Sequence, residues 1–297
     1  MAGRTVMISG ADGFLGRALT TAFADAGWQV FGLIRDLSAK KPPSGLSGAF
    51  EYSFPDRIDA AACDVPVDLF VHNAFFTRMT ADAPDTVNVD AARFLLERFG
   101  GRANTRFAFI SSMSAHEHAW SRYGKEKFAI EKMLDPARHL AIRPGFIVGH
   151  GGIFQRLVVM LSRMPVVPLF YGGSLPIHTV HIDDVCRSLL LLVESGRAGM
   201  WPVGEEASMT IRAFYGSIVD WLQLRSVFLP LPGTPFLHLL RLVERMGVRP
   251  PLTSENLLGL KGLTVYDMNE TVGAIGFRPA SFADSLAKLD RGILMES

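Results

Sequence analysis

Short apolar runs alternate with amphipathic segments along the first half of the chain. The runs Thr5–Ser9, Gln29–Ile34, Val67–Ala74 and Arg106–Ile110 have the length of buried strands, and helical periodicity follows three of them. Phe50–Phe54 is predicted to be a further short strand. Because strands that alternate with helices imply right-handed crossovers, this pattern predicts an α/β fold built on a doubly wound parallel sheet.

The alternation is lost beyond Gly145, where prolines become frequent and apolar helical segments such as Phe154–Arg163 appear. Val180–Val185, followed by a helical segment at Cys186–Glu194, is interpreted as a return to the main sheet. We therefore predict a main domain at residues 1–150, rejoined by 177–203, and a smaller C-terminal substrate lobe at 151–176 and 204–297.

Three glycines with the spacing Gly-x-x-Gly-x-x-Gly separate the first strand from the first helix. Gly10 permits a tight turn, Gly13 lets a pyrophosphate approach the backbone, and Gly16 lets helix and strand pack closely. The helix that begins at Phe14 and Leu15 presents free N–H groups and a positive dipole end to an anion. The main domain is therefore predicted to be a Rossmann-type dinucleotide-binding domain.

A Tyr-x-x-x-Lys motif, Tyr123 to Lys127, lies on a segment with helical periodicity. Residues four apart share one helix face, so the phenol and the ammonium can address one site. An adjacent ammonium, with an oxidised nicotinamide, is expected to lower the pKa of the phenol and fit it for proton transfer. Ser112, at the end of a predicted strand, can donate a hydrogen bond to a substrate oxygen.

Composition excludes several classes of protein. The 297 residues are 48% hydrophobic and 20% charged, with a formal net charge of +1 and no basic block, so nothing indicates a nucleic-acid partner. The apolar stretches Ile153–Met160 and Phe236–Val243 are far shorter than the roughly 20 residues that a membrane span needs. Cys63 and Cys186 lack metal-ligand spacing, so we expect no metal, no disulfide and a cytoplasmic protein.

Taken together, these motifs resemble the extended short-chain dehydrogenase/reductases, a family of NAD-dependent epimerases, dehydratases and dihydroflavonol-reductase-like enzymes. The marks are the glycine turn, His72-Asn73-Ala74, Asn88, Ser111-Ser112, Tyr123-x-x-x-Lys127, Arg143-Pro144-Gly145-x-x-x-Gly149 and His181-Ile182-Asp183-Asp184-Val185. The resemblance implies a Ser112-Tyr123-Lys127 triad and a homodimer. It also implies that Asn73 and Ala74 line the cofactor, that Lys127 binds the nicotinamide ribose, and that Pro144 and Gly145 pass near the nicotinamide.

The chain departs from this family at two places. The interval from Ser112 to Tyr123 is shorter than the family norm, and Ile177 stands where many nucleotide-sugar enzymes carry an arginine. The expected reaction is hydride transfer between a nicotinamide and a carbonyl or alcohol carbon. The alternatives are a nucleotide-sugar 4-epimerase or ketoreductase, and a non-catalytic dinucleotide-binding module. His116 and His118, in the shortened loop, either border the active site or are solvated.

The end of the second strand decides the choice of cofactor. An acidic residue there binds the adenosine ribose of NAD, but Ile34 occupies that position. The next residue, Arg35, can make a bidentate contact with a 2′-phosphate, and Lys40 and Lys41 add positive charge. NADP is therefore predicted, and NAD is the alternative because Asp36 can turn toward the ribose.

Overall fold

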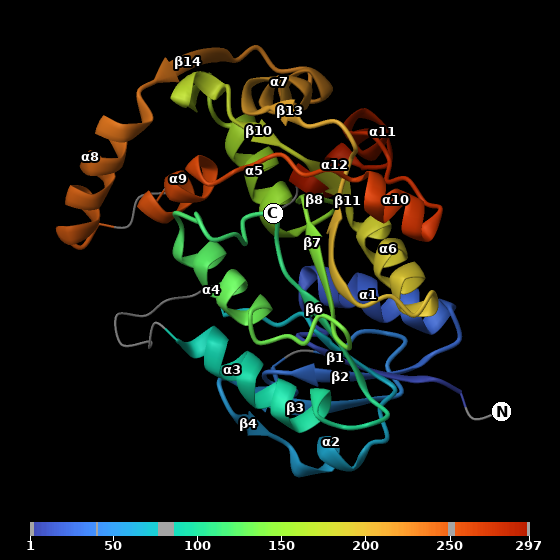
Figure 1. Ribbon diagram of the computed structural model, residues 1–297. Coiled ribbons are helices and arrows are strands. Elements are labelled where there is room, and N and C mark those ends of the chain that lie inside the picture. Colours follow the sequence, from blue (N-terminus) through green and yellow to red (C-terminus); the bar gives the residue numbers. More distant parts are fainter. Residues whose placement is uncertain (1–2, 40, 77–85, 249–252, 296–297) are drawn as a thin grey trace. The chain divides into compact units, whose positions relative to one another are not determined.

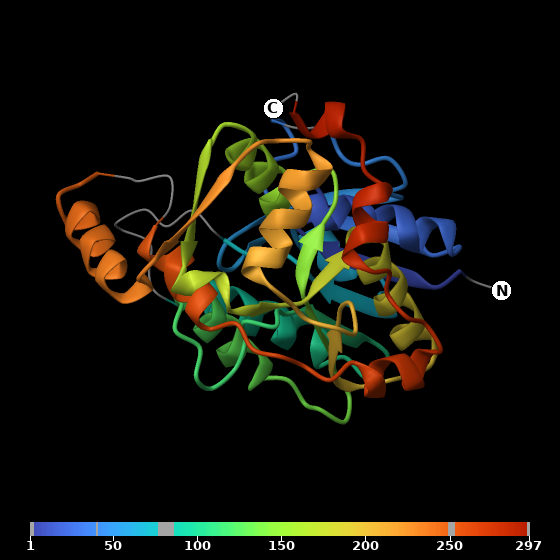
Figure 2. The same ribbon diagram turned by 90° about the horizontal axis from the view of Figure 1, so that it is seen from above.

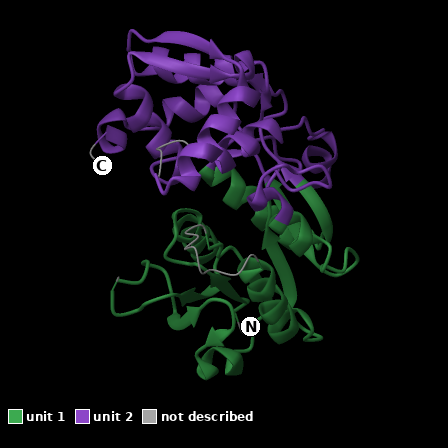
Figure 3. Cartoon of the chain, turned by 90° about the vertical axis from the view of Figure 1, so that its left-hand side faces the viewer, with its two compact units in different colours: residues 1–111, 126–143, 182–201 green, residues 112–125, 144–181, 202–297 purple. Residues whose placement is uncertain are grey.

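The computed structural model describes residues 3–39, 41–76, 86–248 and 253–295. The chain divides into two compact units, which Figure 3 shows in different colours. Unit 1 comprises residues 1–111, 126–143 and 182–201, and unit 2 comprises residues 112–125, 144–181 and 202–297. Helix α4 (Arg122–Glu131) begins in unit 2 and ends in unit 1.

Unit 1 is built on an eight-stranded sheet with the order β12-β7-β6-β5-β1-β2-β3-β4. The pairs that join β1 to β2 and β5, β2 to β3, and β6 to β5 and β7 are parallel, whereas β4 pairs antiparallel at the edge. The strands are β1 (Thr5–Ser9), β2 (Gln29–Ile34), β3 (Gly48–Ser53), β4 (Arg57–Ile58), β5 (Leu69–His72), β6 (Arg106–Ile110), β7 (Leu140–Pro144) and β12 (Gly199–Val203). The predicted doubly wound α/β sheet is confirmed.

Helices cover both faces of this sheet (Figure 1). Helix α1 (Phe14–Asp25) packs against α6 (Ile182–Glu194) on one face. Helix α3 (Val87–Leu95) and the π-helix η1 (Leu96–Gly100) cover the other, and α2 (Ala60–Asp64) joins β4 to β5. In the sheet, β1 lies between β2 on one side and β5 on the other, so the strand order reverses at β1. Ligands bind at the carboxyl ends of the strands at such a point.

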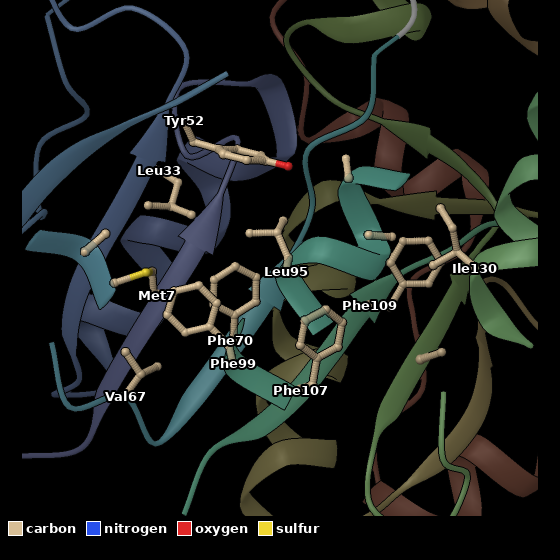
Figure 4. Close-up of a cluster of buried hydrophobic side chains, with 14 residues drawn as sticks. Met7, Leu33, Tyr52, Val67, Phe70, Leu95, Phe99, Phe107, Phe109 and Ile130 are labelled. Atoms are coloured by element: carbon tan, nitrogen blue, oxygen red, sulfur yellow. The ribbon is translucent and has the colours of Figure 1, made fainter. Parts of the chain in front are cut away.

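The core of unit 1 is a cluster of aromatic rings between the sheet and α3 (Figure 4). Phe70 of β5 stacks on Phe99 of η1 with ring centroids 4.3 Å apart, and on Phe107 of β6 at 5.4 Å. Side chains alternate along a strand, so Phe107 and Phe109 both point toward this cluster. All five residues of β1 are buried, which fits a strand that is covered on both faces.

Unit 2 is built from short strands and helices (Figure 2). Its strands pair in twos: β10 (Pro176–Ile177) with β13 (Met209–Thr210), β11 (Thr179–His181) with β8 (Phe146–Val148), and β14 (Val227–Leu231) with β9 (Val166–Phe170). Its helices are α5 (Gly152–Ser162), the 3-10 helix η2 (Tyr171–Gly173), α7 (Ile211–Trp221), α8 (Gly233–Arg245), α9 (Ser254–Lys261), α10 (Asn269–Ile275), α11 (Phe282–Ala287) and α12 (Arg291–Met295). Phe154, Phe214 and Phe282 are fully buried in its main core.

One strand was predicted in the wrong sheet. Val180 lies in β11, which pairs with β8 of unit 2 instead of returning to the main sheet. The element of this region that joins the main sheet is β12. The strand is only three residues long, and its apolar pattern does not specify which distant strand it pairs with.

The compact units do not follow the predicted domain limits, because residues 112–125 fall in unit 2 and the chain re-enters unit 1 at residue 182. Cys63 is partly exposed and Cys186 is buried, and both are free thiols. Across the described ranges, no helix is both long enough and apolar enough to cross a membrane.

Candidate active site

The glycine turn joins β1 to α1 as predicted. Gly10 has a φ of +68°, and its N–H donates to the carbonyl of Leu33 at 2.8 Å, so the end of β2 lies beside the turn. A Cβ on Gly16 would lie 2.0 Å from the carbonyl oxygen of Gly10, and one on Gly10 would lie 3.0 Å from the Cα of Ala74. Gly13 precedes α1 without a side-chain cap. The first N–H groups of α1, including those of Phe14 and Leu15, are thus left for an anion.

The hydroxyl of Ser9 organises the end of β5. Its oxygen accepts hydrogen bonds from the N–H groups of Asn73 and Ala74, each at 3.1 Å, and lies 2.9 Å from Nδ1 of His72. Burial lowers the pKa of His72 to about 3, with Lys127 adding to the effect, so the ring is neutral. Both lone pairs of Ser9 are used, and its O–H therefore donates to Nδ1. This arrangement holds Asn73 and Ala74 against Gly10.

Asn88, a mark of the family resemblance, fixes the chain that follows Ala74. Its side chain accepts from the N–H of Phe76 at 2.7 Å and donates to the carbonyl of Phe76 at 3.2 Å. The same amide donates to the buried carboxylate of Glu126 at 2.8 Å. Asn88 thus ties the segment after β5 to the helix that carries the Tyr-x-x-x-Lys motif.

Lys127 is buried in unit 1, on α4. Its ammonium donates to the carbonyl of Ile110 at 2.6 Å and lies 4.5 Å from the ring centroid of Phe75 and 4.6 Å from that of Phe109. Burial lowers the pKa of Lys127 to about 7, and the carboxylates of Glu131 and Glu126 oppose that fall. The site therefore holds a lysine whose charge changes near neutral pH.

A buried ion pair lies one helical turn beyond Lys127, and it was missed from the sequence. Glu131 accepts from Nε of Arg143 at 2.8 Å and from Nη2 at 2.6 Å, and Ser111 donates to the same carboxylate at 2.5 Å. The spacing of four residues from Lys127 to Glu131 on one helix was the available signal. The hydroxyl of Ser111 is thus engaged by Glu131.

Ser112 and Tyr123 come together in unit 2, where their side chains are hydrogen-bonded. Tyr123 is 39% exposed as a residue, but burial of its hydroxyl raises the pKa of the phenol, and the hydrogen bond with Ser112 opposes the rise. This direction is opposite to the one expected from a neighbouring ammonium, because desolvation outweighs the other effects. Tyr123 and Lys127 lie four residues apart on α4.

Pro144 and Gly145 lie at the end of β7. The carbonyl of Pro144 accepts from the N–H of Met113 at 3.2 Å, and Gly145 donates to Val203 at 2.9 Å. A Cβ on Gly145 would lie 2.5 Å from the carbonyl oxygen of His178, so a glycine is needed there. These contacts hold Pro144 next to the segment that carries Ser112.

The end of β2 carries the residues predicted to select the cofactor. The exposed guanidinium of Arg35 lies 5.4 Å from the ring centroid of Phe76. Asp36 does not turn freely, since its Oδ1 accepts from the hydroxyl and N–H of Ser38 and the N–H of Ala39. The hydrogen bond from the Ser38 hydroxyl is the main cause that lowers the pKa of Asp36. Lys41 is exposed, and Lys40 lies outside the described residues.

The two histidines of the shortened loop have different environments. Nε2 of His116 lies 2.8 Å from the carbonyl of Gly262, so this ring joins the loop to the end of α9. His118 has a side chain that is 82% exposed beside Glu117. Neither contact involves Ser112 or Tyr123, so the structure favours a structural His116 and a solvated His118.

The sequence was compared with protein-family models and with known proteins. No protein-family model matches the chain. A ceramide reductase from Caulobacter vibrioides is 30% identical over 213 residues, which cover 66% of this chain and 62% of the reductase. The chain thus spans less than two thirds of that relative's length.

Solved structures are similar over nearly the whole chain. MoeE5, in complex with UDP-glucuronic acid and NAD, has a TM-score of 0.70 at 18% identity, covering 95% of this chain and 96% of its own. A UDP-N-acetylglucosamine 4-epimerase from Methanobrevibacter ruminantium has a TM-score of 0.67 at 17% identity, covering 100% and 97%. The resemblance seen in the motifs is confirmed: this chain has the fold of the extended short-chain dehydrogenase/reductases, the NAD-dependent epimerases and dehydratases.

Proposed function

We propose that the protein is an NADP-dependent reductase of the extended short-chain dehydrogenase type, in which Ser112, Tyr123 and Lys127 act on a carbonyl or alcohol carbon. The observation that carries the proposal is the hydrogen bond between the side chains of Ser112 and Tyr123, with Lys127 one turn farther along the same helix. A serine and a tyrosine hydroxyl that share a hydrogen bond can both contact one substrate oxygen.

The glycine turn fits a dinucleotide. Any Cβ at Gly16 would overlap the backbone of Gly10, and Gly13 keeps the first N–H groups of α1 accessible. Asn73, Ala74 and the exposed Arg35 lie beside this turn through β5 and β2, and we assign them, with Gly10, Gly13, Phe14, Leu15 and Gly16, to cofactor binding. A bound nicotinamide dinucleotide supplies the hydride.

The protein side chains supply the proton and the electrostatic stabilisation. Tyr123 stays protonated at neutral pH because its pKa is raised, which suits a proton donor in the direction of carbonyl reduction. Ser112 donates to the oxygen on which negative charge develops. Lys127 is assigned to the ribose of the nicotinamide and to the stabilisation of the phenolate, and Pro144 and Gly145 to the wall beside the nicotinamide.

The names of the relatives support two substrate classes. The Caulobacter relative is named a ceramide reductase, which favours a long-chain carbonyl lipid here. The second candidate is a nucleotide-sugar 4-epimerase or ketoreductase, favoured by the substrates named for the two similar structures. Ile177 is a buried apolar residue where many nucleotide-sugar enzymes carry an arginine, so we place this candidate second. A non-catalytic dinucleotide-binding module comes third, because the Ser112–Tyr123 pair is intact.

The test is to incubate the purified protein with NADPH or NADH and with either a long-chain keto lipid or a UDP-hexose. A reductase consumes reduced cofactor stoichiometrically with the keto substrate. An epimerase changes the sugar, followed by NMR, without net consumption of cofactor. If the protein binds NADPH but turns over neither the keto lipid nor the UDP-hexose, the non-catalytic dinucleotide-binding module is favoured.

A further inference from the structure

Helix α8 exposes apolar residues on the side that faces away from the core of unit 2. Leu237 and Leu240 are buried against α9 and Phe170. Leu239, Leu242 and Met246, spaced by three and four residues, form one stripe on the opposite side and are 52%, 57% and 73% exposed. A helix at the surface of a globular protein normally carries polar side chains at such positions.

The charges of α8 are arranged beside this stripe. Arg241 and Arg245 are both exposed. They are four residues apart, so they lie on one side of the helix, between the buried apolar residues and the exposed apolar stripe. The one acidic residue of the helix, Glu244, is directed toward α9, where its carboxylate accepts from the N–H and the hydroxyl of Ser254, both at 2.6 Å. The outward charge of the helix is therefore positive.

The strand that leads into α8 has an exposed apolar face as well. Val227 pairs with Val166 of β9, and the side chains of such partners in parallel strands lie on the same face. Both are exposed, as is Leu229, two residues farther along β14, whereas the intervening Phe228 packs into the core. Figures 1 and 2 show β14 and α8, both in orange, as successive elements of the chain.

We propose that α8, with the exposed face of β14, docks the protein on an anionic lipid bilayer. Leu239, Leu242 and Met246 enter the acyl boundary, and Arg241 and Arg245 contact the phosphates of the headgroups. This is the composition of an interfacial helix, with an apolar stripe and adjacent basic residues. A stable protein dimer buries on the order of 1,200–2,000 Å², whereas this stripe is one helix wide.

The proposal goes beyond the reductase activity and does not depend on it, but the two fit together within unit 2. Helix α9, on which α8 packs, also contacts the segment that carries Tyr123. Glu255 of α9 accepts from the N–H of Arg122 at 2.8 Å, and Lys261 lies 3.5 Å from the ring centroid of Trp120. Docking of α8 keeps this segment near the bilayer, where a lipid substrate resides.

The experiment is flotation of the full chain with vesicles of phosphatidylcholine alone or of equimolar phosphatidylcholine and phosphatidylglycerol. We expect binding to the mixed vesicles, at least tenfold weaker binding after the double substitution Leu239→Ser and Leu242→Ser, and loss of the preference for phosphatidylglycerol after Arg241→Gln and Arg245→Gln. The matched controls are Ile153→Ser with Ile293→Ser, which are 64% and 53% exposed on other helices, and Lys132→Gln with Arg138→Gln. Both control pairs should bind as the wild type does.

Other outcomes separate this proposal from the proposed function. Wild type that does not float, or that floats equally well with and without the leucines, overturns the docking and leaves the reductase assignment untouched. A dimer in light scattering that the leucine substitutions dissociate, without vesicle binding, assigns the stripe to a second copy and also overturns the proposal. Vesicle binding that depends on the leucines in a protein with no turnover supports the docking and removes the reductase assignment. The double leucine variant should retain the thermal midpoint and the turnover of a water-soluble carbonyl.

Discussion

The ammonium of Lys127 donates a hydrogen bond to the carbonyl of Ile110 with an Nζ–O distance of 2.6 Å. Ile110 is the last residue of β6, so the lysine is fixed to the end of the strand that precedes Ser111 and Ser112. The contact holds a cationic group in a buried place, next to two phenylalanine rings. The position of Lys127 is therefore set by contacts with residues of unit 1, namely Ile110, Phe75 and Phe109.

The first prediction concerns the pH dependence of stability. Burial lowers the pKa of Lys127 from 10.5 to about 7, so the unfolded chain binds more protons than the folded chain between these pH values. The burial of Lys127 therefore destabilises the folded chain most below about pH 7. This destabilisation disappears as the pH rises toward 10.5, the pKa of the lysine in the unfolded chain. The free energy of unfolding, from urea titrations, should therefore rise more steeply with pH in the wild type than in Lys127→Met.

A matched lysine on the next turn serves as the control. Lys132 is exposed on the surface after α4. Lys132→Met should keep the pH dependence of the wild type. Parallel curves for the wild type and Lys127→Met would show that Lys127 keeps its proton on folding, contrary to our account.

The second prediction concerns the ion pair between Glu131 and Arg143, whose side chains are 1% and 15% exposed. Glu131→Gln removes a bidentate carboxylate from a largely buried guanidinium, so it should lower the free energy of unfolding by about 3 kcal/mol. Asp90→Asn breaks an exposed pair with Arg93 and should cost less than about 1 kcal/mol. Equal losses in urea titrations would mean that burial of the first pair has no energetic consequence.

The third prediction tests the glycine turn. Gly16→Ala places a methyl group against the carbonyl of Gly10, so the turn must shift, at a cost of about 1–3 kcal/mol or more, and NADPH binding should weaken at least tenfold. Gly216→Ala, in the middle of α7 with no atom within 4 Å of the new Cβ, should instead stabilise by about 0.5–1 kcal/mol. Normal NADPH binding by Gly16→Ala, measured by calorimetry, is the result that excludes the turn as the cofactor cradle.

The fourth prediction concerns the choice of cofactor. Arg35 is exposed at the end of β2, and Asp36 is held by the hydroxyl and N–H of Ser38, so the wild type should prefer NADPH over NADH by tenfold or more, at least about 1.4 kcal/mol. Arg35→Ala should remove most of this preference, and Arg57→Ala, on the exposed edge strand, should not. Tighter binding of NADH by the wild type would reverse the assignment.

The sequence predicts local elements of the fold better than the contacts that join them. The glycine turn and the strand Arg106–Ile110 are local patterns, and both were predicted within a residue or two. The ion pair of Glu131 with Arg143 was missed because its partners come from a helix and a strand that no local pattern connects. The same reason explains β11, whose pairing with β8 depends on tertiary packing over 30 residues away in the chain.

The raised pKa of Tyr123 could not be predicted from the sequence either. The spacing to Lys127 indicates an adjacent cation, but the pKa depends on how deeply the hydroxyl is buried, and burial of one atom is set by the fold around it. The hydrogen bond from Ser111 to Glu131 was likewise not predicted, because it joins a strand end to a helix twenty residues farther along the chain.

The most direct measurement is the turnover of Tyr123→Phe with NADPH and the best carbonyl substrate. Loss of the proton donor should lower kcat by roughly 10²–10⁴-fold while the Kd for NADPH stays within about twofold of the wild type. Tyr215→Phe, which removes another phenol hydroxyl of unit 2, should leave kcat unchanged. Near-normal turnover by Tyr123→Phe would contradict the assignment of Tyr123 as the proton donor.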